Sequence, residues 1–99
     1  MAGGDPVLRG DGTLEWRDAQ GRLHRAGGPA VEHANGSEKW YRDGRRHRDG
    51  APACVYVNGT EKWYRNGLRH RDGGPAAIYP DGRRIWFVDG VRVREDREG

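Results

Sequence analysis

Residues along much of the chain alternate one by one between two faces of an extended strand, and short turn signals interrupt the alternation. In the segment 61–65, Trp63 faces one side, while Lys62 and Tyr64 face the other. The preceding copy of this segment places Trp40 on one face with Glu38 and Arg42, and Lys39 and Tyr41 on the opposite face. No segment shows convincing helical periodicity. The pattern predicts short β-strands throughout.

Asn-Gly and Asp-Gly pairs separate these strands, and such pairs are the strongest two-residue signal for a β-hairpin. The interval after a hairpin turn also holds a proline, Pro52 or Pro75, so it is either one strand bent at a bulge or two strands split by a loop. We expect an all-β fold, a single-layer antiparallel meander of β-hairpins with type I′ turns. The pairs stand at positions 11–12, 35–36, 43–44, 58–59, 66–67, 81–82 and 89–90.

The pattern repeats with a period of 23 residues, and the copies 35–57 and 58–80 are nearly identical. Units of such an array cannot bury their own apolar faces and must pack on their neighbours. A residue found in every copy is therefore better explained as part of the building unit than as part of one active site. We divide the chain into a worn N-terminal cap (1–10), a repeat array (11–96, as 11–34, 35–57, 58–80 and 81–96, with degenerate outer copies) and a charged tail (97–99).

Tryptophan recurs once in each copy, and equivalent positions fall in a row across the strands of a meander. We expect the four rings to form a buried ladder, with Trp40 and Trp63 more deeply buried than Trp16 and Trp86, and with neighbouring tyrosines filling the gaps. An exposed aromatic stripe that binds a ligand is the alternative for a face that the sheet leaves uncovered.

Composition limits the protein class. Apolar and charged residues each make up 33% of the 99 residues, which suits a thin sheet better than a thick two-layer core. The single cysteine fits a reducing compartment. No apolar run reaches membrane-spanning length and the start lacks the apolar region of a signal peptide, so we expect a cytoplasmic location and no membrane partner.

The unit Trp-Tyr-Arg-Asn-Gly at 63–67, followed by His70 and a Gly-Pro turn, resembles the MORN repeat group. It is most similar to the bacterial and phage variant, whose members include antitoxin-like proteins, and the resemblance covers roughly residues 5–94. It implies a twisted β-hairpin array that offers its concave surface to a protein partner.

Histidines 24, 47 and 70 stand in register, yet residues two strands apart are about 9–10 Å from each other, too far to share one zinc ion. Cys54 lacks a local orienting group of the kind that a Cys/His nucleophile pair requires. We therefore expect no metal, no cofactor and no catalytic residue.

Arginine accounts for 16 of the 18 basic residues and gathers in the central copies. Arginines among Trp and Tyr can bind phosphates or stack on bases. Their stems can equally cover the aromatic ladder while Glu38, Glu61, Asp49 and Asp72 balance their charges. Because acidic residues alternate with basic ones, we favour the second interpretation.

We conclude from the sequence that this is a non-enzymatic binding module, prokaryotic or phage, that neutralises a toxin, a nuclease or a defence effector. Binding of nucleic acid or a nucleotide ligand by the central Arg/aromatic surface is the alternative, and a monomer and a dimer both remain open. Arg, Trp and Tyr dominate protein interfaces. The predicted binding residues are Trp40, Tyr41, Arg46, Tyr64, Arg69 and Arg71.

Overall fold

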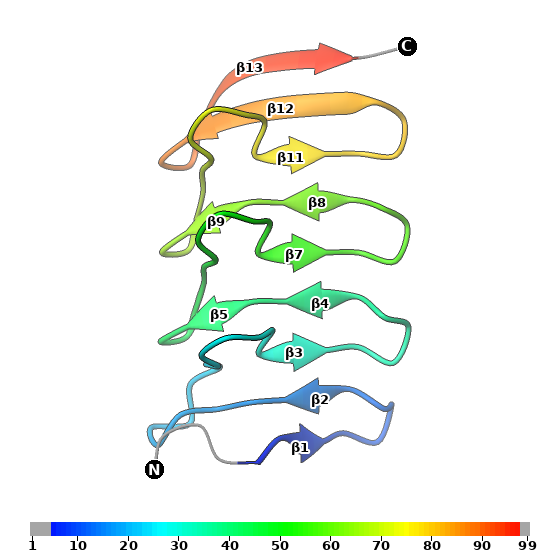
Figure 1. Cartoon of the computed structure of the whole chain (residues 1–99), viewed down its shortest axis with the longest axis vertical. Coiled ribbons are helices and arrows are strands. Elements are labelled where there is room, and N and C mark those ends of the chain that lie inside the picture. Colours follow the sequence, from blue (N-terminus) through cyan, green and yellow to red (C-terminus); the bar gives the residue numbers. More distant parts are fainter. Residues whose placement is uncertain (1–4, 98–99) are drawn as a thin grey trace.

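A computed structural model describes residues 5–97 and confirms the all-β meander (Figure 1). Nine strands form one antiparallel sheet in the order β1-β2-β3-β4-β7-β8-β11-β12-β13, and two small hairpins, β5-β6 and β9-β10, extend from it. The molecule measures 44 × 26 × 17 Å. The strands are β1 (Val7–Leu8), β2 (Leu14–Glu15), β3 (Val31–Glu32), β4 (Glu38–Lys39), β5 (Tyr41–Arg42), β6 (Arg45–Arg46), β7 (Cys54–Val55), β8 (Glu61–Lys62), β9 (Tyr64–Arg65), β10 (Leu68–Arg69), β11 (Ala77–Ile78), β12 (Arg83–Val88) and β13 (Val91–Arg97).

The structure decides between the two possibilities for the proline-containing interval. After β10, the second strand of the small hairpin β9-β10, the chain forms a loop through Pro75 and enters the nine-stranded sheet as β11, so this interval is two strands split by a loop. The loop carries no strand and lies over one side of the sheet in Figure 1. Proline suits this place because it cannot donate to a strand ladder.

The Asx-Gly pairs form two different turns. At 43–44, 66–67 and 89–90 both residues have positive φ, as a type I′ turn requires; Asn66, for example, has φ 50° and Gly67 has φ 87°. At 58–59 only Gly59 has positive φ, and the Asn58 side chain instead accepts a hydrogen bond from the backbone N–H of Thr60 at 2.9 Å. The prediction of type I′ turns at every pair is therefore wrong for the pairs at 11–12, 35–36, 58–59 and 81–82.

Small residues, rather than tryptophans, form the fully buried core. Ala53 and its equivalents in the neighbouring copies, Ala30 and Ala76, have no exposed surface, and Cys54 is the largest side chain that is fully buried. All four tryptophans are half-buried, in contrast to the predicted buried ladder. Trp40 and Trp63 fall in the same range of exposure as Trp16 and Trp86, so the predicted deeper burial of the central pair is not seen. A single layer offers no second sheet to cover large rings, so these remain at its surface.

Arginines from the loops cover the tryptophans instead. The Arg48 guanidinium lies 3.8 Å from the centre of the Trp40 ring and donates to the carbonyl of Pro52 at 3.1 Å. Arg71 makes the same two contacts, with Trp63 and Pro75, one repeat later. Arginines thus cover the tryptophans as predicted, but with the guanidinium rather than the stem. The remaining pairs are Arg25 with Trp16 and, from strand β13, Arg94 with Trp86.

A histidine joins each inner repeat to the next. His70 Nδ1 accepts the backbone N–H of Asp89 at 2.9 Å, and its Nε2 lies 2.8 Å from the Asp72 carboxylate. Because Nδ1 accepts, Nε2 carries the proton and donates to Asp72. His24 makes the first of these contacts, with Asp43, but has no aspartate at Nε2 because its copy carries an alanine there. The three histidines in register are thus structural joints.

The two ends of the array differ. Residues 5–10 of the predicted N-terminal cap contain only the two-residue strand β1, and residues 1–4 lie outside the described part. At the other end β13 is seven residues long and pairs with β12 through Arg97, while residues 98–99 of the predicted tail are not described.

Candidate binding surface

Strand register sorts the charged side chains onto opposite faces of the sheet. One row of cross-strand neighbours includes Lys39, Cys54 and Lys62. The adjacent row includes Glu38, Val55 and Glu61. Because successive residues of a strand point to opposite faces, the two lysines lie on one face and the two glutamates on the other.

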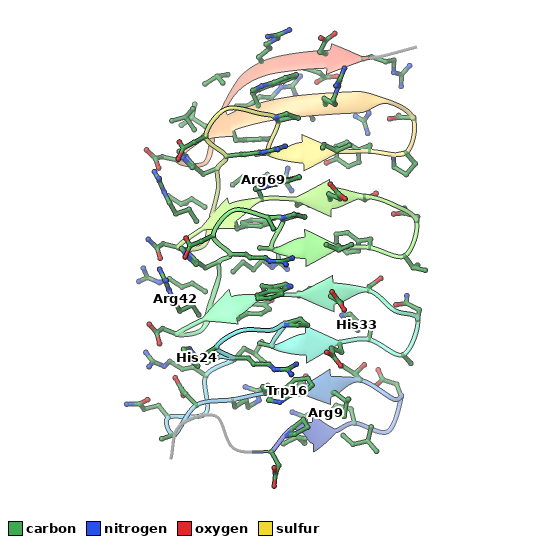
Figure 2. The ribbon with its side chains drawn as sticks, in the orientation of Figure 1. Arg9, Trp16, His24, His33, Arg42 and Arg69 are labelled. Carbon is green, nitrogen blue, oxygen red and sulfur yellow. The ribbon has the colours of Figure 1, made fainter. Side chains whose placement is uncertain are left out.

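Aromatic and basic residues of the small hairpins extend the lysine face. Tyr41 pairs with Arg46 in one hairpin, and Tyr64 pairs with Arg69 in the next. Arg69 lies over the middle of the sheet, whereas Arg42 lies at the edge formed by the hairpin tips (Figure 2). We define the basic face as Lys39, Tyr41, Arg46, Tyr56, Lys62, Tyr64, Arg69 and Tyr79.

The four cations of the basic face have no carboxylate within ion-pair distance among residues 5–97, and they contact tyrosines instead. Arg46 donates to the hydroxyl oxygens of Tyr41 and Tyr64, both at 3.3 Å, and Arg69 donates to that of Tyr64 at 3.4 Å. The hydrogen bond to Tyr41 raises the pKa of the Arg46 guanidinium above its usual range. Since these hydroxyls accept from arginine, their own hydrogens remain available to donate to an anion.

Two cations lie over each of two tyrosine rings. Lys39 and Lys62 lie 5.9 and 5.5 Å from the centre of the Tyr56 ring. Arg46 and Arg69 lie 5.3 and 5.8 Å from the centre of the Tyr64 ring, and Tyr64 is only 8% exposed. The basic face therefore presents cations beside the partly exposed Tyr56 ring, while the Tyr64 ring is buried.

The structure brings together four of the six predicted binding residues and separates the other two. Tyr41, Arg46, Tyr64 and Arg69 belong to the basic face. Trp40 alternates with Lys39 and Tyr41 and so belongs to the opposite face. Arg71 stacks on Trp63 at 4.0 Å and supports the fold there.

Sequence reasoning missed Lys39, Tyr56, Lys62 and Tyr79 as members of one surface. The available signal was the strand pair Glu-Lys, at 38–39 and again at 61–62, in which the acid and the base must face opposite ways. The predicted balancing of arginines by Glu38 and Glu61 is absent, since neither forms an ion pair among the described residues. Asp49 and Asp72 do bind cations, at the hairpin-tip edge, where they contact Arg42 at 3.8 Å and Arg65 at 3.7 Å.

Two equivalent grooves, of about 340 and 490 Å³, lie between consecutive loops, and their linings include Tyr64 and Tyr41 of the basic face. The first is lined by Arg48, Trp63, His70, Arg71 and Asp72, among others. These groups already contact one another in the stacks and joints described above, so the grooves present few unengaged polar groups.

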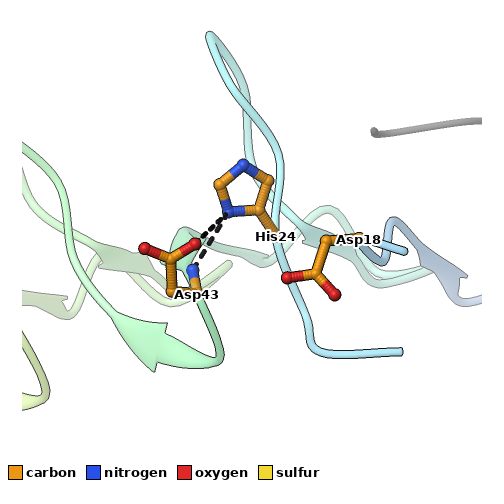
Figure 3. A group of neighbouring side chains, drawn as sticks. All are labelled: Asp18, His24 and Asp43. Carbon is orange, nitrogen blue, oxygen red and sulfur yellow. Dashed lines mark hydrogen bonds and ion pairs between the residues drawn. The ribbon is translucent and has the colours of Figure 1, made fainter. Parts of the chain in front are cut away.

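Asp18, His24 and Asp43 form the one group with metal-ligand geometry among residues 5–97, with ligand atoms within 4.8 Å of one another (Figure 3). His24 Nδ1 already accepts the Asp43 backbone N–H at 3.0 Å. The Asp18 carboxylate accepts two backbone N–H groups and pairs with Arg22 at 2.9 Å. The cluster is thus explained by its own hydrogen bonds, and a metal would have to break the joint between two repeats.

Cys54 sits beneath the basic face. Burial raises the pKa of its thiol, although Arg46, Lys39 and Lys62 act in the opposite direction. A nucleophilic cysteine needs a lowered pKa and access to substrate. Neither condition is met.

Comparisons with protein-family models, with curated proteins and with solved structures gave no match for this chain. Within residues 5–97, no helix has the length and apolar character needed to cross a membrane.

Proposed function

We propose that the chain is a non-enzymatic binding module that docks an acidic surface of a protein partner on its basic face and neutralises that partner. The observation that carries this proposal is the set of four cations that have no carboxylate partner among residues 5–97, two of which are hydrogen-bonded to tyrosines. The sheet is already built, so docking requires little ordering of the chain. Charge complementarity then gives fast and selective association.

The nature of the partner follows from a second line of argument. The resemblance to MORN repeats, and to the variant with antitoxin-like members, favours a toxin, a nuclease or a defence effector of a bacterium or phage. A module that neutralises its partner by covering the partner's active surface needs no catalytic residue of its own. This agrees with the burial of the Cys54 thiol and with the histidines, which hold neighbouring repeats together.

Nucleic acid is the second candidate, because the same four cations, which have no carboxylate partner within the described part of the chain, can contact phosphates. In the sequence, acidic residues alternate with basic ones, which argues against nucleic-acid binding. On the basic face this argument fails, because Glu38 and Glu61 lie on the other side of the sheet. Two features still favour protein. Base recognition on a sheet needs exposed aromatic faces, and the Tyr64 ring, central in the basic face, is buried, while two lysines lie over the Tyr56 ring. Exposed aspartates, such as Asp49 and Asp72, also line the neighbouring edge and would repel a long phosphate backbone.

The test compares two matched charge reversals. In one variant Lys39 and Lys62 become Glu; in the control the adjacent residues on the other face, Glu38 and Glu61, become Lys. Each chain is used to isolate a partner from the native host, and affinity for the purified partner is then measured by calorimetry. We expect the lysine variant to lose at least about tenfold in affinity, since central charge pairs are worth more than about 1.4 kcal/mol. The control should retain binding.

Equal loss in both variants, or in neither, would overturn the assignment of the face. Single-stranded and duplex oligonucleotides are titrated in parallel at low and physiological salt. Tight binding that survives physiological salt would replace the protein partner with nucleic acid.

A further inference from the structure

Three valines at the C-terminal end occupy positions that, one repeat earlier, hold the repeats together. Val88, Val91 and Val93 stand 23 residues after Arg65, Leu68 and His70. Two of these positions thus change from a charged or polar residue to an aliphatic one, and the third stays aliphatic, so all three are aliphatic in the last repeat.

The earlier residues each contact the following repeat. Arg65 pairs with Asp89 at 3.0 Å, and His70 accepts the Asp89 backbone N–H. Leu68 packs against the turn at Gly90, where its Cδ2 lies 3.3 Å from the place a Cβ would take. These three positions are therefore the surface that one repeat presents to the next.

In the last repeat the same positions are exposed and apolar. Val88, Val91 and Val93 are 48%, 64% and 58% exposed. Repeat arrays usually end in a repeat whose outer face is polar, because a polar face keeps the array soluble. This end has charged residues farther along β13 but an aliphatic surface at the joint positions, and such a surface gains free energy when it is covered.

The outer edge of β13 is also open. Over the described residues β13 pairs only with β12, and all seven of its residues are exposed. An edge strand of this length offers backbone N–H and C=O groups to another strand. The edge at the other end, β1, has only two residues.

Strand direction limits how a second copy can be added. β1 and β13 run in the same direction (Figure 1), so a copy stacked head to tail with its faces in the same orientation would have to pair in parallel with β13. The sheet is antiparallel throughout. A second copy related by a two-fold axis presents its own β13 antiparallel to the first and continues the sheet.

Charge fixes the register of that pairing. When Arg92 lies opposite Glu95 of the second copy, the two-fold axis produces the same favourable pair twice, and Val93 lies opposite the aliphatic stem of the second Arg94. Within one chain Arg92 already reaches Glu95, so the two charges can exchange partners across the axis.

We propose that the chain forms a two-fold dimer through antiparallel pairing of its β13 strands, closed by Val93 against the stem of Arg94 and by reciprocal Arg92–Glu95 pairs. This interface is separate from the basic face. It leaves both copies of that face open, so the dimer would be a divalent form of the binding module.

The experiment measures the mass of the 99-residue chain in solution by sedimentation from micromolar to millimolar concentration. We expect a monomer–dimer equilibrium. Arg92→Glu and Glu95→Arg should each weaken dimerisation about tenfold or more, because each puts two like-charged pairs across the axis. The double variant should restore it. Val93→Ser should weaken it as well.

Val57→Ser is the matched control, because Val57 is 67% exposed in an inner repeat, away from β13. It should leave the dimer intact. Circular dichroism confirms that each variant is folded. A chain that is monomeric at every concentration, a double variant that fails to restore the dimer, or assemblies larger than a dimer would each overturn the proposal.

Discussion

His47 Nδ1 accepts the backbone N–H of Asn66 at 3.0 Å, across a separation of 19 residues. The ring is 7% exposed, and its Nε2 lies 3.0 Å from the Asp49 carboxylate. One side chain thus fixes the turn of the following repeat and the loop of its own. The repeated histidine is explained by this double contact rather than by metal binding.

Replacing His47 by Leu should lower the free energy of unfolding by about 1–3 kcal/mol, because the Asn66 N–H loses its acceptor. Asn at the same position can place an oxygen near that of Nδ1 and should recover part of the loss. His24→Leu is the comparison, since His24 is more exposed and has no aspartate at Nε2. The free energy of unfolding of the three variants, His47→Leu, His47→Asn and His24→Leu, is measured in urea. A larger loss for His24→Leu than for His47→Leu would contradict the role of His47 in joining two repeats.

The two Asn-Gly turns of one repeat should respond differently to the same substitution. Asn66 has positive φ, which glycine adopts freely, so Asn66→Gly should change the unfolding free energy by less than about 0.5 kcal/mol. Asn58→Gly removes the acceptor of the Thr60 N–H and should cost about 1 kcal/mol. Thermal and urea unfolding of the pair provide the check. The same small effect at both sites would show that the turns are equivalent after all.

Arg71 should act on stability and not on partner binding. Arg71→Ala removes the stack on Trp63 and the bond to the Pro75 carbonyl, and should cost about 1–2 kcal/mol. Arg71→Lys keeps the charge but loses the planar stack, so it should recover only part of this cost. A folded Arg71→Ala variant that no longer binds the partner would instead return Arg71 to the binding surface.

Cys54 should make the free energy of unfolding fall as the pH rises into the alkaline range. Its thiol pKa is raised in the folded protein, so the folded state favours the neutral thiol. The resulting stability is complete below the ordinary pKa of a thiol and is lost as the pH rises from there through the raised value. Cys54→Ala should remove this slope from the unfolding free energy measured between neutral and alkaline pH.

Alkylation provides an independent measurement for the same residue. Iodoacetamide at neutral pH should modify Cys54 more slowly in the folded protein than in urea, because the folded thiol is both buried and protonated. Rapid reaction of the folded chain would show an accessible thiolate.

The candidate surface could be predicted in part. Tyr41, Arg46, Tyr64 and Arg69 were identified by residue type and by their central position, and the structure places them together. Lys39 and Lys62 were missed because alternating signs were interpreted as mutual cancellation. In a strand, successive side chains point to opposite faces, so alternating acidic and basic residues separate onto the two faces. A segment with no net charge can therefore present one basic face.

The sequence by itself determined the repeat, the all-β class and the places where the chain turns, since all three depend on local chemistry: alternation with a period of two, Asx-Gly pairs and prolines that cannot join a ladder. Only the tertiary structure decided what each repeated side chain contacts. Which of the Asx-Gly turns Asn58 and Asn66 form, and whether Arg71 faces a ring or a partner, depends on how the chain folds back within one repeat. Where His47 finds its donor depends on the neighbouring repeat, 19 residues along the chain. A local pattern carries no information about which of these residues meet in space.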